Sequence, residues 1–157
     1  MNSAREANPG WFEGQTHVFP LRVYFEDTDF SGVVYHASYL RFMERGRSEC
    51  LRLLGLRHQG LLKADEPLVW VVRRIAVEYL RPARAEDDLC VRTRFIAIEG
   101  ARLRLEQVIL RQTPSAIDLT PQVLTEGKVE VCVVTLDGKP RRVPPNMREK
   151  LNSFLLS

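Results

Sequence analysis

One stretch of the chain carries a clear helical pattern of hydrophobic positions. Between Ala37 and Leu54, apolar or small residues recur at spacings of three and four, and charged residues fill most of the other positions. This pattern predicts a long amphipathic helix. Gly55 marks its end, because glycine commonly follows the last residue of a helix. The apolar stripe consists of Tyr39, Met43, Gly46, Cys50 and Leu54.

Gly46 lies within this stripe, where a glycine lowers the helix propensity by about 1 kcal/mol relative to alanine. We therefore interpret Gly46 as a point at which the helix packs closely against a flat surface, such as a sheet.

Alternation of apolar and polar residues with a period of two predicts strands in most of the remaining chain. One strand is expected before the helix and four after it, because turn-forming residues separate the later alternating segments. The segment from Thr113 to Pro121 is expected to be a proline-bounded loop, and a short C-terminal helix carries Met147, Leu151 and Phe154. The expected strands cover residues 16–25, 68–80, 89–95, 103–109 and 123–136.

A single long helix cannot connect every pair of neighbouring strands, so this order of elements excludes a doubly wound parallel sheet. An antiparallel sheet with one helix packed on its face is the simplest arrangement, which makes the chain an α+β protein. With 157 residues, the chain has the length of one domain. We expect residues 1–14, which are polar and contain Gly and Pro, to form a flexible tail, and residues 15–157 to form the domain.

Charge and composition exclude several classes of protein. The 23 basic and 20 acidic residues give a net charge of +3, which does not indicate a nucleic-acid-binding protein but suits a small anionic ligand. The longest apolar run, from Leu68 to Val72, is far shorter than the roughly 18 residues of a membrane span. The first ten residues lack the apolar core of a secretory signal. Three widely spaced cysteines, which we expect in the core, predict no disulfide framework, so a reducing, cytoplasmic setting is expected.

The unusual part of the sequence is the segment VYFEDTDFSGVVYHASY, Val23–Tyr39. It places Glu26, Asp27 and Asp29 between a strand and the long helix, and His36 just before that helix. The first-turn amides of a helix have no partner within the helix and carry partial positive charge. They can therefore stabilise a developing oxyanion while a nearby carboxylate acts as a base or a nucleophile. The same pattern also occurs in turns that only cap a helix, and its spacing alone leaves both interpretations open.

Other groups of residues carry weaker signals. His17, His36 and His58 do not have the spacing of a metal site, so no metal is expected. Several arginines lie on and after one predicted strand, where they form either a solvated edge or a clamp for the phosphates of a nucleotide-like ligand. They are Arg73, Arg74, Arg81 and Arg84, with Arg141 and Arg142 near the C-terminus.

The chain closely resembles the YbgC-type acyl-CoA thioesterases of the hotdog-fold 4-hydroxybenzoyl-CoA thioesterase family in the stretch RVYFEDTDFSGVVYHASYLRFMERGRSE, residues 22–49. Residues 26–39 match the family signature E-D-T-D-x-x-G-V-V-Y-H-x-x-Y. A second segment, VVRRIAVEYLRPARAEDDL at residues 71–89, resembles the family's second and third strands. The resemblance as a whole covers residues 21–143.

This resemblance implies a hotdog fold, in which a five-stranded antiparallel sheet wraps around one long central helix. It also implies hydrolysis of an acyl-CoA thioester to a free acid and CoA, in dimers that often pair into tetramers, with active sites at the subunit interface. The family's catalytic carboxylate corresponds to Asp29, as nucleophile or general base, and its histidine to His36. Amides near Tyr35 and His36 would polarise the carbonyl, and no metal or redox cofactor is needed. The expected substrate-binding residues are Gly32, Tyr35, Arg73, Arg74 and Arg84.

Three alternatives stand beside Asp29 chemistry. Another branch of the superfamily carries its catalytic carboxylate on the helix, where Glu44 is the candidate. A hotdog dehydratase is disfavoured, because His36 is not followed by the Pro-Gly of an H-x-x-x-x-P-G arrangement. The third is a non-catalytic acyl-thioester or protein-interaction module, similar to Tol-Pal-associated proteins of envelope maintenance, with acyl carrier protein as an acidic partner.

Overall fold

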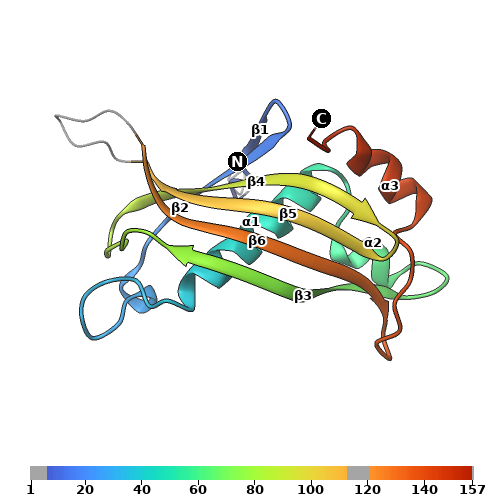
Figure 1. Cartoon of the computed structure of the whole chain (residues 1–157), viewed down its shortest axis with the longest axis horizontal. Helices are drawn as coiled ribbons and strands as arrows, with labels where there is room; N and C mark the ends of the chain where they lie inside the picture. The colour runs from blue at the N-terminus through green and yellow to red at the C-terminus, as the bar shows by residue number, and fades with distance from the viewer. Residues whose placement is uncertain (1–6, 113–120, 157) are drawn as a thin grey trace, which may run out of the picture.

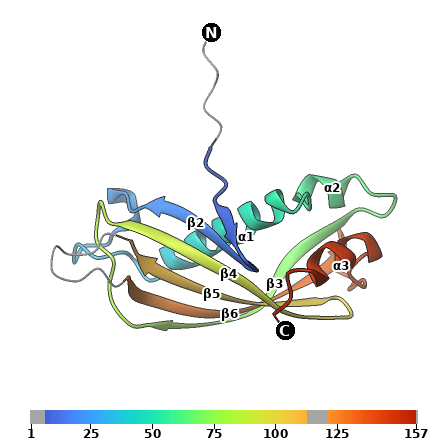
Figure 2. The same ribbon diagram turned by 90° about the horizontal axis from the view of Figure 1, so that it is seen from above.

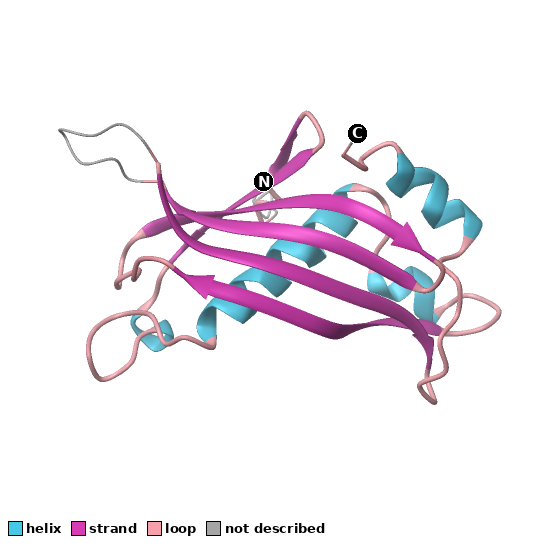
Figure 3. Cartoon of the chain, viewed as in Figure 1, coloured by secondary structure: helices cyan, strands magenta, loops and turns pink. Residues whose placement is uncertain are grey.

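The computed structural model describes residues 7–112 and 121–156, which form one antiparallel sheet with a long helix across it (Figure 1). The elements are β1 (Trp11–Glu13), β2 (Thr16–Arg22), the 3-10 helix η1 (Phe25–Asp27), α1 (Ser38–Leu53), α2 (His58–Leu62), β3 (Leu68–Tyr79), β4 (Asp88–Glu99), β5 (Arg102–Arg111), β6 (Gln122–Thr135) and α3 (Pro145–Asn152). The strands lie in the order β1-β2-β4-β5-β6-β3, so β3 forms one edge of the sheet (Figure 3).

The sheet has six strands in the described residues, one more than the resemblance implied. The additional strand, β1, lies within residues 1–14, which were predicted to form a loose tail. A two-residue turn joins β1 to β2, and its first residue, Gly14, has a φ of 60° that glycine adopts without strain. The ring of Phe12 packs against His17 and Phe154 and so attaches this hairpin to the domain. The tail prediction is therefore wrong for β1.

The other predicted elements are confirmed with small changes at their ends. The first predicted strand ends at Arg22 instead of Phe25, because η1 occupies the last residues. Met147 and Leu151 of α3 are buried in the core of the domain. The predicted loop at residues 113–121 lies, apart from Pro121, outside the described residues. Within the described part of the chain, no helix is both long and apolar enough to cross a membrane.

The alternation predicted for β3 holds only after a bulge. The pairing of β3 with β6 shifts register between Val72 and Arg74, so one residue of β3 is extra at that point. Before the bulge, Leu68 and Trp70 pack into the core, whereas after it the core side is occupied by Ile75 and Val77. A bulge moves the side chains that follow it to the opposite face. The sequence alternates apolar residues at Val69, Val71, Ile75 and Val77 with Arg73 as the exception, and this shift explains why Val71 and Ile75 do not share one face.

The helix α1 lies across one face of the curved sheet (Figure 2). At Gly46 the helix approaches β4 so closely that a Cβ atom would lie 2.8 Å from Val91 Cγ1. Next to this contact, the fully buried Gln107 of β5 donates hydrogen bonds to Met43 O and Thr93 Oγ1, both at 2.9 Å. The close packing predicted at Gly46 is confirmed, and a buried side-chain amide joins the helix to the sheet.

Replacing Gly46 with alanine is expected to lower the free energy of unfolding by about 1–3 kcal/mol, because the added methyl group overpacks the contact with Val91. The gain in helix propensity is only about 1 kcal/mol. Chemical denaturation of both proteins measures this difference. Gly60→Ala is the matched control, since Gly60 also lies in a helix but a Cβ there meets nothing within 4 Å. Equal effects of the two substitutions would contradict the prediction.

Candidate active site

The segment between β2 and α1, which we name the acidic loop (residues 24–37), folds into a tight turn around Asp29. Thr28 pairs with Val34, and the Asp29 N–H donates to Val33 O at 2.9 Å. The turn closes with a hydrogen bond from the Gly32 N–H to Asp29 O at 3.0 Å. Gly32 has a φ of 84°, a conformation that side chains other than glycine's rarely adopt. Gly32 shapes the turn that presents Asp29, and its binding of substrate stays a prediction.

The side chain of Asp29 lies exposed at this turn. Its Oδ1 accepts hydrogen bonds from the Ser31 N–H, at 2.8 Å, and from the Ser31 hydroxyl. These hydrogen bonds, with a smaller contribution from His36, hold the pKa of Asp29 below its ordinary value of 3.8. Asp27 has a different role: it is buried, and its Oδ2 accepts a hydrogen bond from the Tyr24 N–H at 2.8 Å. The structure therefore assigns the local structural role to Asp27 and leaves Asp29 as an exposed, ionised carboxylate.

His36 lies at the end of the acidic loop among aromatic rings. Its ring centroid is 4.5 Å from that of Tyr35 and 6.5 Å from that of Tyr79, at the end of β3. The Tyr79 hydroxyl donates to the backbone oxygen of His36 at 2.8 Å. The end of β3 thus contacts the loop immediately before α1. Within residues 7–112 and 121–156, no three His, Cys, Asp or Glu side chains gather as metal ligands would.

No side chain of the described residues forms a cap hydrogen bond with the N-terminus of α1. The Tyr35 N–H donates to Asp27 O at 2.9 Å and the Ser38 N–H to Tyr35 O at 2.8 Å. The Tyr35 amide is therefore occupied within the loop, so it is not a free oxyanion donor as predicted. In the part of the chain that the structure describes, the amides of His36 and Ala37 donate to no protein acceptor. The amides of His36 and Ala37 are therefore the remaining candidates for donors to a substrate oxyanion.

Several large aromatic side chains of the acidic loop, on both sides of Asp29 in the sequence, are exposed. Phe30 is fully exposed and Phe25 is 86% exposed, with Tyr24 and Tyr35 also exposed. A group of exposed aromatic residues in one short segment is typical of a surface that a ligand or a partner covers. The acidic loop therefore resembles one side of a larger site.

A second loop, residues 80–87 between β3 and β4, holds the acidic loop in place. The Val34 N–H donates to Ala83 O at 2.8 Å, and Val33 pairs with Arg84. The Ala83 N–H in turn donates to the hydroxyl of Tyr39, on α1, at 2.9 Å. The sequence placed Tyr39 in the apolar stripe but did not reveal this hydrogen bond. The available signal was its phenol, because a buried tyrosine hydroxyl usually finds a hydrogen-bond partner.

The three arginines predicted to bind CoA phosphates occupy different places. Arg84 lies beside the acidic loop through its pairing with Val33. Arg73 and Arg74 lie in the middle of β3, where the Arg73 guanidinium forms an ion pair with Glu130 at 2.7 Å. At about 3.3 Å per residue, they are roughly 15–20 Å from the Tyr79 end of the strand. Of these three arginines, only Arg84 pairs with a residue of the acidic loop.

A cavity of about 110 Å³ opens between α1 and the β3 edge. Its rim carries Glu44, Ser48 and His58. The Ser48 hydroxyl donates to Glu44 Oε1 at 2.9 Å and lies 3.3 Å from His58 Nε2. Trp70 also lines the cavity, and its buried Nε1 has no hydrogen-bond partner among residues 7–112 and 121–156. Glu44, the alternative catalytic carboxylate, thus lies at this cavity and not in the acidic loop. The remaining lining residues are Arg47, Leu51, Val71, Val72, Phe95, Leu103, Leu105 and Val131.

Comparisons with known proteins agree with this architecture. The family model of the thioesterase-like superfamily matches residues 23–151. The acyl-CoA thioesterase YbgC of Haemophilus influenzae is 42% identical over 125 residues, which cover 80% of this chain and 85% of that protein. The crystal structure of a probable thioesterase from Bartonella henselae is 44% identical with a TM-score of 0.75, and the match covers 82% of this chain and 99% of that one.

The likeness in fold extends to distant relatives. A 4-hydroxybenzoyl-CoA thioesterase mutant, complexed with 4-hydroxybenzoyl-CoA, has a TM-score of 0.77 at 16% identity, over 87% of this chain and 98% of that one. The match to the family model covers both the acidic loop and the sheet. The chain therefore has the hotdog fold and belongs to the thioesterase-like superfamily, as a relative of the YbgC acyl-CoA thioesterases.

Proposed function

We propose that this protein hydrolyses acyl-CoA thioesters, with Asp29 as the carboxylate that drives the reaction. The observation that supports this most directly is the setting of Asp29, an exposed ionised carboxylate in a tight turn of the loop that leads into the N-terminus of α1. The amides of His36 and Ala37 supply the positive end of the helix, where a thioester oxygen gains negative charge. His36 lies beside them and orients the substrate.

Two routes of thioester hydrolysis use these groups. In the first, an Asp29 oxygen attacks the carbonyl carbon, the C–S bond breaks, CoA leaves as its thiolate, and water hydrolyses the resulting anhydride. In the second, Asp29 takes a proton from a water molecule, whose oxygen attacks the carbonyl carbon. The tetrahedral intermediate then collapses with cleavage of the C–S bond, and CoA leaves as its thiol by taking up the proton from Asp29. The His36 and Ala37 amides stabilise the oxyanion in either route. Arg84 is our candidate to bind a CoA phosphate, and its pairing with Val33 of the acidic loop supports this choice.

The active unit is a dimer joined through β3. This strand is twelve residues long, and on the side away from β6 no strand of the described residues pairs with it; Val71 and Val72 are exposed. A long apolar edge strand presents free backbone groups that another chain can pair with. A two-fold axis through the edge would pair β3 with the same strand of a second copy. This arrangement also places a second chain against the exposed aromatic residues of the acidic loop.

The cavity between α1 and β3 then belongs to the active site of the second copy. In one chain, the cavity borders Val71 and Val72, about 25 Å along β3 from Tyr79, which contacts His36. Antiparallel pairing of the two β3 strands brings the Tyr79 end of one chain toward the cavity of the other. We infer that this cavity receives the acyl group. Its volume is of the order of a cavity that holds benzene, which favours a short acyl chain or a single ring.

Release of free thiol from a panel of acyl-CoA esters tests this function. The panel should run from acetyl-CoA through branched short-chain and benzoyl-CoA to palmitoyl-CoA. We expect hydrolysis of the compact esters, with kcat/KM at least about tenfold above that for palmitoyl-CoA, since one misfitted methylene already costs about 1–3 kcal/mol. No thiol release from any ester would overturn the proposed function. Binding of acyl carrier protein without hydrolysis would support the interaction module instead.

A further inference from the structure

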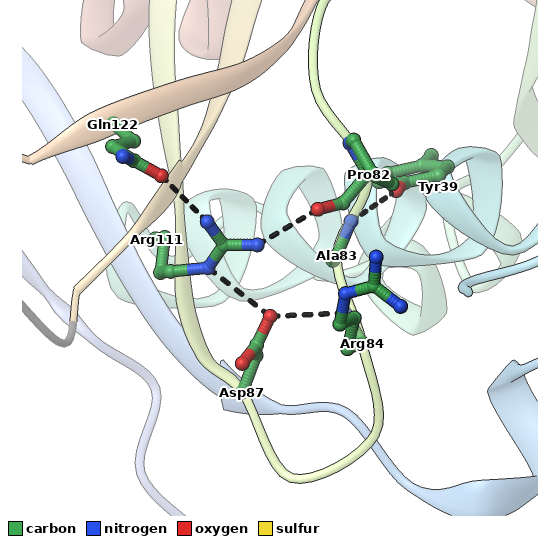
Figure 4. Close-up of polar contacts among 7 residues, drawn as sticks. All are labelled: Tyr39, Pro82, Ala83, Arg84, Asp87, Arg111 and Gln122. Atoms are coloured by element: carbon green, nitrogen blue, oxygen red, sulfur yellow. Dashed lines mark hydrogen bonds and ion pairs between the residues drawn. The ribbon is translucent and has the colours of Figure 1, made fainter. Parts of the chain in front are cut away.

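One arginine outside the acidic loop connects both legs of the 80–87 loop. Arg111, at the end of β5, uses all three guanidinium nitrogens (Figure 4). Its Nε donates to Asp87 Oδ2 at 3.1 Å, its Nη2 to the backbone oxygen of Pro82 at 2.7 Å, and its Nη1 to Gln122 Oε1. Pro82 lies on the side of the loop that leaves β3, and Asp87 lies on the side that enters β4. We call these two sides the legs of the loop. A single side chain, only 22% exposed, therefore sets the distance between the two legs.

The 80–87 loop holds the acidic loop at both of its ends. At the start, Val23 exchanges two backbone hydrogen bonds of 2.9 Å with Glu86 and Asp87. At the other end, the Val34 N–H donates to Ala83 O. The contact at Val34 lies one residue from Val33, whose backbone oxygen accepts the hydrogen bond from the Asp29 N–H. A change in the spacing of the two legs would therefore reach the turn that carries Asp29.

We propose that Arg111 is a positioning residue for thioester hydrolysis, which acts through the 80–87 loop on the placement of Asp29 and His36. This inference rests on the proposed function of Asp29. Arg111 contacts neither residue, so its effect passes through Pro82, Asp87 and the backbone pairs that they hold. The planar guanidinium suits this task, because its fork of donors reaches several acceptors at fixed angles, whereas a lysine ammonium cannot.

Asp87 makes this network selective for arginine. Its Oδ2 accepts both the Arg84 N–H, at 2.9 Å, and the Arg111 Nε–H (Figure 4). Asp87 is 25% exposed on its side chain, so water does not fully replace a lost partner. Without Arg111, the carboxylate and Pro82 O would both lose a donor, and the loop would lose its side-chain connection to the end of β5.

The test compares Arg111→Met, Arg111→Lys and Arg94→Met. Arg94 is the matched control, because it forms a comparable ion pair with Glu106, at 3.0 Å, in the middle of the sheet and away from both loops. We expect Arg111→Met to lower kcat by about 10²-fold, because a displacement of about 1 Å in a catalytic group can have this effect. KM is expected to change by less than about threefold, because the substitution displaces the catalytic groups and leaves substrate binding largely intact. Arg111→Lys is expected to lie between Met and the wild type, and Arg94→Met to keep the wild-type kcat.

Hydrogen–deuterium exchange supplies a readout that does not depend on activity. In Arg111→Met, backbone amides of residues 28–36 are expected to exchange faster, whereas those of β4 and β6 keep their protection. Wild-type kcat and unchanged exchange in Arg111→Met would overturn the proposal. It would also be overturned by a uniform rise in exchange across the sheet with a matching loss of thermal stability, since this indicates a merely structural residue. If the wild type hydrolyses no ester, the proposed function fails, and the exchange pattern still decides whether Arg111 positions the loop.

Discussion

Replacing Asp29 with asparagine is expected to lower kcat/KM for acyl-CoA hydrolysis by about 10²–10⁴-fold. The amide keeps the shape of the side chain and can still accept the hydrogen bond from Ser31. It has no negative charge, so it is a poor nucleophile and a poor base. Thiol release under single-turnover conditions measures the loss in the chemical step. The fold should be unaffected, because Asp29 is exposed and its backbone bonds hold the turn.

Two further variants make this result specific to Asp29. Asp65→Asn makes the same change at an exposed carboxylate before β3, outside the acidic loop, and is expected to retain wild-type activity. Glu44→Gln tests the alternative carboxylate on α1, and is expected to alter the acyl preference more than kcat, because Glu44 lies at the cavity rim. Full activity in Asp29→Asn together with an inactive Glu44→Gln would transfer the chemistry to the helix.

The pH dependence follows from the hydrogen bonds at Asp29. The pKa of this carboxyl is lowered, first by the Ser31 hydroxyl and then by the Ser31 amide. Its ionised form is therefore the reactive one at all pH values above that lowered pKa. In the pH range where the protein is folded, wild-type kcat/KM should therefore stay constant on the acid side and fall only below the ordinary carboxyl pKa of 3.8. A pH profile of kcat/KM measures this.

Elements whose pattern is local were predictable from the sequence. The stripe along α1 reflects burial against one flat surface, so Gly46 already indicated a close contact. The bulge in β3 was not predictable, because it depends on how Val72 and Arg74 pair with β6. The strand β1 has only three residues, too few for a period, and it depends on the contact of Phe12 with Phe154, far away in the chain.

The candidate site was likewise only partly predictable from the sequence. The acidic loop was located because its carboxylates, glycine and histidine are close in sequence. Its supports come from elsewhere: Tyr39 from α1, Tyr79 from β3 and Arg111 from β5. The positions of these three residues in the sequence do not reveal their partners, so only the folded chain shows that they meet at residues 80–87 or at His36. The cavity at Trp70 likewise depends on four strands and two helices coming together.

Mixing two inactive variants is expected to restore activity if each site combines Asp29 of one chain with the cavity of another. The first variant is Asp29→Asn. The second is Ser48→Trp, in which a large ring fills the cavity from its half-buried rim on α1. Each variant alone should lose more than about 90% of its activity on a compact ester, since the first lacks the carboxylate and the second the acyl site. The two are denatured together, refolded and assayed against each variant refolded alone.

Random pairing puts one chain of each kind into half of the dimers, and each mixed dimer holds one intact site out of two. The mixture should therefore recover about one quarter of the wild-type activity per chain, as the two-fold symmetry of a β3-paired dimer requires. A site built from a single chain would give no recovery, because no chain in the mixture would have both Asp29 and an open cavity. Recovery would at once identify the dimer as the active unit and the cavity as the acyl site. Its absence, with both variants folded and dimeric, would return the cavity to the Asp29 of its own chain or remove it from the reaction.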